Sequence, residues 1–290
     1  MKKCFLSLRL RTLPLSAAGV ILGNFLLEEK CNFSIIVFIL SLATALLLQI
    51  VSNLANELGD YRHGLDNKDR QGPAYALQQG LISYKALRNL VIFFVILSAI
   101  LGFALVCYSM ECIFSSVTLT FLIVGGLAIL AALTYTLGKK PYGYRAFGDL
   151  SVFIFFGLLA VLGSNYLQNL HFLPKMLLPA SAIGFLSVAV LNLNNIRDLD
   201  NDKACGKLTI ALKLGERNAK IYHALLVVLA ELFLVVYGCY EALFLLPVYI
   251  YHIVSVFRLS GRDLDKQFPL LSFSTLLLAI LCGLVEFFCK

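Results

Sequence analysis

The chain consists largely of apolar runs of the length that crosses a lipid bilayer as a helix. A bilayer core is about 30 Å thick, which an α-helix of roughly 20 apolar residues spans. Hydrophobic residues make up 60% of the 290 and charged residues only 14%, too few for the surface of a soluble domain of this size. We therefore predict an all-α, polytopic membrane protein that forms a single domain over residues 1–290. The runs predict about nine transmembrane helices, at 13–28, 34–58, 86–107, 113–137, 147–167, 175–196, 220–238, 241–258 and 268–288.

Basic residues are distributed unevenly between the predicted loops. Of the 24 Lys and Arg residues, four precede the first run and seventeen lie after the second, fourth, sixth and eighth runs, which leaves Lys30, Lys175 and Lys290. Loops rich in Lys and Arg stay in the cytoplasm, so we expect a cytoplasmic N-terminus and cytoplasmic charged loops. The net charge of +7 follows mostly from this topology, and no nucleic-acid partner is expected. We expect the first run to be a retained span, because no small-residue cleavage site follows it.

Two clusters of Asn and Asp close the second and sixth apolar runs. Asn56 and Asp60 are four residues apart, and so are Asp198 and Asp202, so each pair shares a face if the helix continues. Both clusters are predicted on the same side of the membrane. Hard oxygen ligands of this kind suit Mg²⁺, which binds through one or two carboxylates and the phosphates of a substrate. Asp60, Asp198 and Asp202 are therefore predicted to be functional.

Other acidic residues leave two interpretations open. Helix-end acids often cap a helix or meet water, and this interpretation is as good as a functional one for Glu57, Asp66 and Asp69. Asp263 and Asp265, in the last charged loop, are interpreted as an ordinary polar surface.

Basic and aromatic residues follow both clusters along the chain. The basic residues are placed to take the phosphate charge that a metal does not neutralise. The tyrosines either form the interfacial aromatic belt of a membrane protein or face a developing allylic cation, and both interpretations stay open. The predicted substrate-binding residues are Tyr135, Lys139, Lys140, Tyr142, Arg145, Lys207 and Arg217.

Several other kinds of site are absent from the sequence pattern. No HExxH, P-loop or GxSxG pattern occurs, which disfavours a metalloprotease, an NTPase and an α/β-hydrolase. The eight cysteines include no CxxC pair, so we expect them to pack as small hydrophobic residues without a metal or disulfide. A transporter of an anionic solute is the main rival class, but transporters place polar groups near the bilayer midplane, where Glu231 is the main example here.

Four stretches of the chain resemble the UbiA superfamily of membrane prenyltransferases, and within it the branch that prenylates 1,4-dihydroxy-2-naphthoate in menaquinone biosynthesis. They are R-T-L-P at 11–14, N-L-A-N-E-L-G-D-Y-R-H-G-L-D-N-K-D-R-Q-G-P at 53–73, Y-T-L-G-K-K-P-Y-G-Y-R-A-F-G-D at 135–149 and N-N-I-R-D-L-D-N-D-K-A-C-G-K-L-T at 194–209, followed by L-G-E-R-N-A-K at 214–220. The resemblance implies a nine-helix bundle in which two Asp-rich motifs bind Mg²⁺ and diphosphate, with a lateral opening for the isoprenoid tail.

The resemblance also implies a set of catalytic residues and metal ligands. Asn56 and Asp60 match the first motif, and Asp198 and Asp202 match the second. The chain departs from the family at Glu57, where Asp is commoner, and at Gly64, where other branches carry a further Asp. Asp66 is the residue that could replace it as a ligand. The implied ligands of Mg²⁺ are Asn56, Asp60, Asp66, Asp198 and Asp202.

The implied reaction transfers a polyprenyl group from polyprenyl diphosphate to 1,4-dihydroxy-2-naphthoate with loss of carbon dioxide, which gives demethylmenaquinol. Mg²⁺ is the expected cofactor, the lipid bilayer of a bacterial cytoplasmic membrane is the expected surrounding, and no obligate protein partner is inferred. Other acceptors of the superfamily, namely 4-hydroxybenzoate, homogentisate and haem, remain alternatives.

Overall fold

The computed structural model describes residues 5–27, 33–110 and 114–289. Within these residues the chain forms helices and turns and no strands. The short helices and turns are α1 (Phe5–Leu8), η1 (Leu10–Thr12), η3 (Tyr142–Tyr144), α6 (Gly148–Val152), α7 (Ser164–Asn169), η5 (Pro174–Met176), α9 (Leu199–Ala204), α10 (Ile210–Leu214), η6 (Tyr240–Leu245) and η7 (Gly261–Lys266). The longer ones are α2 (Leu13–Phe25), α3 (Ile35–Arg62), α4 (Tyr84–Ser109), α5 (Ser116–Thr134), the π-helix η4 (Phe153–Gly163), α8 (Leu177–Arg197), α11 (Glu216–Tyr237), α12 (Leu246–Arg258) and α13 (Gln267–Cys289).

Eight helical segments of the described chain are long and apolar enough to cross a membrane. They correspond to the second to ninth predicted spans, and consecutive short elements join to form several of them, such as Gly148–Asn169 and Gly261–Cys289. The first predicted span corresponds to α2, which has 13 residues. The prediction of an all-α membrane bundle with about nine spans is therefore confirmed, with α2 shorter than a full bilayer crossing.

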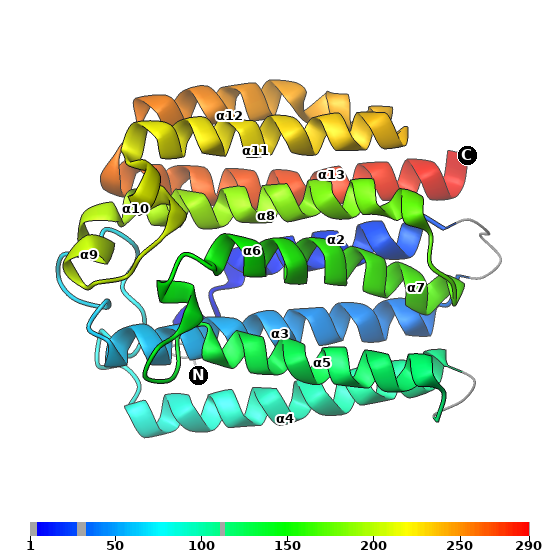
Figure 1. Ribbon diagram of the computed structural model, residues 1–290, viewed down its shortest axis with the longest axis horizontal. Helices are drawn as coiled ribbons and strands as arrows, with labels where there is room; N and C mark the ends of the chain where they lie inside the picture. Colours follow the sequence, from blue (N-terminus) through cyan, green and yellow to red (C-terminus); the bar gives the residue numbers. More distant parts are fainter. Residues whose placement is uncertain (1–4, 28–32, 111–113, 290) are drawn as a thin grey trace.

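The long helices run side by side, and the short helices α9 and α10 gather with the connecting loops at one end of the bundle (Figure 1). The C-terminus lies at the other end. Among the segments that could cross a membrane, the one containing α8 is the most buried and α5 is the least. α8 packs against α11, η4 and α13, whereas α5 packs against α3 and α4. α8 thus lies in the core of the bundle and α5 at its rim.

The fifth span changes its hydrogen-bonding pattern within the bundle. It begins as α6, continues as the π-helix η4 and ends as α7. A Cβ atom on Gly157 of η4 would lie 2.5 Å from the Cα of Gly184 in α8, and a Cβ on Gly184 would lie 2.6 Å from the Phe153 ring. Two facing glycines therefore allow η4 and α8 to approach at backbone distance.

Candidate active site

Three of the predicted carboxylates lie buried where α3 and α8 end, which we call the carboxylate end of the bundle (Figure 1). The exposed fractions of Asp60, Asp198 and Asp202 are 9%, 7% and 1%. Asn56 lies one turn before Asp60 on the same face, because α3 continues to Arg62. Carboxylates this buried need cations or hydrogen-bond donors around them.

Asp60 is held by a tyrosine from the loop between α5 and α6. The Tyr144 hydroxyl donates to Asp60 Oδ1 at 2.7 Å. Burial and the charge of Asp60 raise the pKa of the Tyr144 phenol above its ordinary value, so the phenol keeps its proton. Backbone hydrogen bonds from Leu208 N to Tyr144 O (3.0 Å) and from Ala146 N to Leu208 O (2.8 Å) tie this loop to the segment after α9. The two loops therefore fix the position of Tyr144.

Asp198 and Asp202 differ in their charge partners. The chain leaves the helical conformation at Asp198, but the Asp202 N–H still donates to Asp198 O at 2.8 Å, so the four-residue spacing persists into α9. Burial opposes the charge of Asp198, but Arg197, whose Nη2 donates to Oδ2 at 2.7 Å, holds the pKa of this carboxyl below its usual range. Burial raises the pKa of the Asp202 carboxyl to about 6, and Lys207, at 3.2 Å, offsets only part of that effect.

A cavity of about 550 Å³ runs from the carboxylate end into the apolar interior of the bundle. Its lining at the carboxylate end is polar and charged, whereas its deeper lining is apolar and comes from α3, α4, α5 and η4. The polar lining includes Arg9, Asn56, Asp60, Arg70, Asn194, Asn195, Arg197, Asp198 and Lys207. The apolar lining includes Leu48, Val106, Phe121, Leu122, Phe155, Phe156 and Leu159. Such a cavity accommodates a ligand with a charged head and an apolar tail.

Three arginines in the lining were not predicted as ligand contacts, namely Arg9, Arg70 and Arg197. The Arg9 guanidinium lies 3.8 Å above the centre of the Tyr75 ring, and that of Arg70 lies 4.9 Å from it. The Arg9 backbone has a φ of 49°, which is unusual for a residue other than glycine. Arg9 Nε and Nη2 are buried and have no hydrogen-bond partner among the described residues. Arg9 therefore presents unused donors at the polar part of the cavity.

Two acids of the first cluster have structural partners. Glu57 is fully buried and accepts a hydrogen bond from Leu77 N at 2.7 Å, which anchors the loop after α3. The Asp66 carboxylate is ion-paired with Arg70 and fully enclosed. It does not line the cavity that Asp60 and Asp198 line. The structure thus brings Asp60 and Asp198 together around the cavity, whereas neither Asp66 nor Asp202 lines it.

The predicted substrate-binding residues fall into two groups. Tyr135, Tyr142 and Lys207 line the cavity, and the two tyrosine rings meet edge to face with centres 5.3 Å apart. The other four lie exposed in the loop between α5 and α6 and in the first turn of α11, and they do not line the cavity: Lys139, Lys140, Arg145 and Arg217. The sequence did contain signals for Arg9 and Arg70, which were not predicted. Arg9 lies close to the R-T-L-P stretch, and Arg70 lies in the first cluster of acidic residues.

Asp265 belongs to the same charge network, so its interpretation as ordinary polar surface is wrong. Arg197 Nη1 donates to Asp265 Oδ1 at 2.5 Å, and Arg11 Nη1 pairs with Asp265 Oδ2 at 2.8 Å. The pairs connect η7, the start of the chain and the end of α8. Asp263, two residues earlier, pairs with Lys266 at the exposed surface.

These features define a helical membrane protein with a buried, carboxylate-rich site at one end of a cavity for an amphiphilic ligand. The chain belongs to the UbiA prenyltransferase family, whose sequence pattern matches residues 16–283. It is 47% identical over 220 residues to the 1,4-dihydroxy-2-naphthoate octaprenyltransferase of Escherichia coli (strain K12), and the matched region covers 76% of this chain and 71% of that protein. It is 42% identical over 226 residues to the protein of the same name in Haemophilus influenzae (strain KW20), which covers 77% and 73%.

Solved structures share the fold over nearly the whole chain. A UbiA homologue from Aeropyrum pernix K1 without ligand has a TM-score of 0.66 at 20% identity, with 98% of this chain and 97% of that one covered. A UbiA homologue from Archaeoglobus fulgidus bound to GPP and Mg²⁺ has a TM-score of 0.65 at 16% identity, with 98% and 99% covered. The helical bundle is therefore that of the UbiA prenyltransferases.

Proposed function

We propose that this chain transfers a polyprenyl group from polyprenyl diphosphate to 1,4-dihydroxy-2-naphthoate, with loss of carbon dioxide, to give demethylmenaquinol. The cavity is the observation that carries the proposal, because buried carboxylates and four cationic side chains at one end continue into an apolar lining. An isoprenoid diphosphate has this distribution of charge and apolar surface. The names of the relatives from Escherichia coli and Haemophilus influenzae support the choice of acceptor.

The carboxylate end has the donor set that Mg²⁺ requires. Asn56, Asp60 and Asp198 offer oxygen atoms to the cavity, and Asp202 Oδ2 is buried with no hydrogen-bond partner among the described residues. We propose that these four residues hold the ion. The proposal is supported by UbiA homologues from Archaeoglobus fulgidus, whose structures contain Mg²⁺ together with GPP or DMAPP. Bound Mg²⁺ supplies positive charge that neutralises the departing diphosphate. Asp66 stays a prediction as a further ligand, and its pairing with Arg70 disfavours it.

Cationic side chains complete the diphosphate site. Arg9 has donors without a partner among the described residues, Lys207 donates to Asp202, and Arg70 lies beside Arg9 over the same tyrosine ring. We propose that Arg9, Arg70 and Lys207 donate hydrogen bonds to the phosphate oxygens, and that these bonds strengthen as the leaving group gains charge. Lys139, Lys140, Arg145 and Arg217 stay predicted contacts of the part of the ligand nearest the water.

The apolar part of the cavity provides the environment for bond cleavage. The C–O bond of the donor breaks and its electron pair leaves with the diphosphate. The resulting allylic cation faces Tyr135 and Tyr142, and exclusion of water by the surrounding helices protects it from hydrolysis. The ring carbon that bears the carboxylate then forms the new C–C bond. The bond between the ring and the carboxylate carbon then breaks, carbon dioxide departs, and the electrons of that bond return to the ring. No separate base is therefore required.

The test is prenyl transfer by the purified full chain in detergent with labelled polyprenyl diphosphate. We expect a Mg²⁺-dependent product with 1,4-dihydroxy-2-naphthoate and none with 4-hydroxybenzoate or homogentisate. Asp60→Asn, Asp198→Asn and Asp202→Asn should each lower turnover on the order of a hundredfold or more, while the melting temperature in detergent stays near that of the wild type. A product with another acid alone would contradict the acceptor. No product with any acid, together with anion transport into liposomes, would support the transporter class instead.

A further inference from the structure

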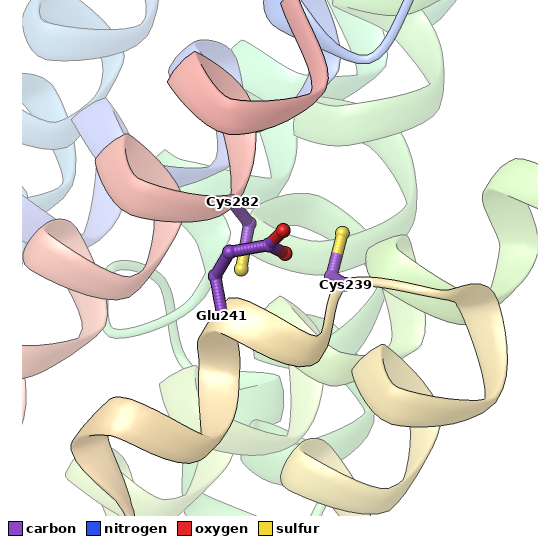
Figure 2. Close-up of side chains that lie close together, drawn as sticks. All are labelled: Cys239, Glu241 and Cys282. Atoms are coloured by element: carbon purple, nitrogen blue, oxygen red, sulfur yellow. The ribbon is translucent and has the colours of Figure 1, made fainter. Parts of the chain in front are cut away.

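Three side chains with metal-ligating atoms meet at the end of the bundle opposite the carboxylate end (Figure 2). Cys239 follows α11, Glu241 lies in η6 and Cys282 lies in α13. Their two thiol sulfurs and a carboxylate oxygen all lie within 4.8 Å of one another. The sequence indicated no metal site among the cysteines, because Cys239 and Cys282 are far apart along the chain and form no short motif. Folding brings them together.

The backbone holds Cys239 and Glu241 in a defined geometry. α11 ends in a Schellman motif, in which Gly238 has a φ of 109° and its N–H donates to Val235 O at 3.1 Å, while Cys239 N donates to Leu234 O at 2.9 Å. The next turn starts at once, with Ala242 N donating to Cys239 O at 3.2 Å. Both ligand-bearing residues therefore belong to one rigid turn, and η6 packs against α13, which carries the third.

The surroundings of the cluster favour a cation. Cys239 and Cys282 are fully buried, and the Glu241 carboxylate lies between their sulfur atoms in the view of Figure 2. Two buried thiols beside a carboxylate form a set of metal-ligating atoms, and apolar packing of the cysteines does not explain why the carboxylate is there.

We propose that Cys239, Glu241 and Cys282 form a binding site for a divalent cation that accepts thiolate ligands, with Zn²⁺ as its representative. Zinc lies about 2.3 Å from thiolate sulfur and about 2.0–2.2 Å from carboxylate oxygen, so ligands of a tetrahedral site lie roughly 3.5–3.8 Å apart. The observed limit of 4.8 Å requires a contraction of about 1 Å, which loss of the thiol protons permits. Binding forms two Zn–S bonds and one Zn–O bond, and the two thiol protons pass to the solvent.

This site differs in chemistry and place from the proposed Mg²⁺ site. The proposed Mg²⁺ ligands at the carboxylate end bind through hard oxygen atoms, whereas two thiolates select a softer ion. The three ligands leave a fourth position for water. Because the ligands join the turn between α11 and α12 to α13, the ion connects these three helices at the end remote from the diphosphate.

The first experiment measures Zn²⁺ binding to the purified full chain by equilibrium dialysis and elemental analysis. Excess Mg²⁺ is present, so that oxygen-ligand sites are occupied. We expect one Zn²⁺ per chain, an affinity at least about tenfold weaker in Cys239→Ser and Cys282→Ser, and no change in Cys205→Ser, whose half-buried thiol lies at the carboxylate end. Glu241→Gln tests the third ligand, which lies at a half-buried position. Equal Zn²⁺ binding by the wild type and Cys239→Ser would overturn the proposal.

Two spectroscopic and thermal measurements distinguish thiolate ligation from Zn²⁺ held elsewhere on the chain. Co²⁺ bound by the wild type should give thiolate-to-metal charge-transfer absorption that disappears in Cys282→Ser, and Zn²⁺ should raise the melting temperature of the wild type but not of Glu241→Gln. Absence of the charge-transfer band would refute thiolate ligation. A Cys239–Cys282 disulfide found by mass spectrometry in protein taken from membranes without reductant would also overturn the proposal. Neither result depends on prenyl transfer, so this proposal and the proposed function fail independently.

Discussion

Arg197 connects one of the proposed metal ligands, Asp198, to the rest of the fold. Its guanidinium binds Asp198 on one side and Asp265 on the other, and it is 5% exposed. Arg11 neutralises the remaining charge of Asp265. A buried arginine of this kind is fixed by its two carboxylates, and it fixes them in turn. The orientation of Asp198 therefore depends on Asp265, which lies outside the cavity.

Replacement of Asp265 tests this dependence. In Asp265→Asn, Arg197 and Arg11 both lose an ion pair, and Asp198 is no longer held in one orientation. We expect the Mg²⁺ concentration for half-maximal activity to rise by about tenfold, because residues that position metal ligands typically contribute about 10–100-fold to affinity. Asp263→Asn is the matched control, since Asp263 lies on the same turn and pairs with Lys266 at the exposed surface. Identical Mg²⁺ titrations for the two variants would show that Asp265 does not position the site.

The raised pKa of Asp202 predicts a pH dependence of metal binding. The carboxyl binds its proton more tightly in the folded chain than in the unfolded chain, because burial raises its pKa to about 6. Its protonated form is thus favoured below this pH, and a metal must displace the proton. We expect the affinity for Mg²⁺ to fall by about tenfold from about pH 7 to about pH 5, from this one proton alone. Thermal shift with Mg²⁺ at the two pH values measures it, and Asp202→Asn should lose the pH dependence together with most of the affinity.

The carboxylates of the site were predictable at the residue scale, whereas most of its cations were not. Asp60 and Asp198 lie at the ends of apolar runs, so their depth and their common side follow from the pattern of the runs. The cations depend on how loops fold back. Arg9 comes from the start of the chain and Arg70 from a loop, and the two meet over Tyr75. Lys139 and Lys140 are near the site in sequence, yet their loop turns them outward.

Among the elements, the pattern of apolar runs predicts the spans but not their internal hydrogen bonding. The pattern reports length and hydrophobicity, which the bilayer sets for any kind of helix. The change from α6 to the π-helix η4 and the two short helices after α8 depend on tertiary contacts instead. Asn56 and Asp60 were predicted to share a face if the helix continues past them, and α3 does extend to Arg62. The contact of Gly157 with Gly184 could not be anticipated, because it depends on which helices become neighbours.

This glycine contact predicts a stability effect of a single methyl group. In Gly157→Ala the new Cβ would meet backbone atoms of α8 at 2.5 and 2.7 Å, which only a shift of the helices relieves. We expect a loss of about 1–3 kcal/mol and a lower melting temperature in detergent. Gly126→Ala is the control, since its Cβ would meet nothing within 4 Å and alanine favours the helical state by roughly 0.5–1 kcal/mol. Gly157→Ala with a melting temperature equal to or above the wild type would contradict the close contact of η4 and α8.

At the scale of the whole molecule, the two proposed sites lie at opposite ends of one bundle. The carboxylate end carries the charged loops, and the thiol cluster lies where loops are short and nearly neutral. The core formed around α8 extends between them, and the cavity enters it from the carboxylate end. The diphosphate of the substrate therefore reaches the site from the side of the membrane that the carboxylate end faces. The excess of basic residues in the loops at this end predicts that this side is the cytoplasm.

Cys205 and Cys289 are natural probes of this orientation. Cys205 is half-buried just after α9 at the carboxylate end, and Cys289 is exposed at the end of α13. Three helical segments of membrane length lie between them, so the two thiols face opposite sides whether or not α2, with 13 residues, crosses completely. In variants that keep only one of these cysteines, a membrane-impermeant maleimide added to intact cells should label Cys289 but not Cys205. After permeabilisation both should react, and a variant without cysteines should react in neither condition. Labelling of Cys205 on intact cells would place the carboxylate end outside and would rule out the proposed orientation.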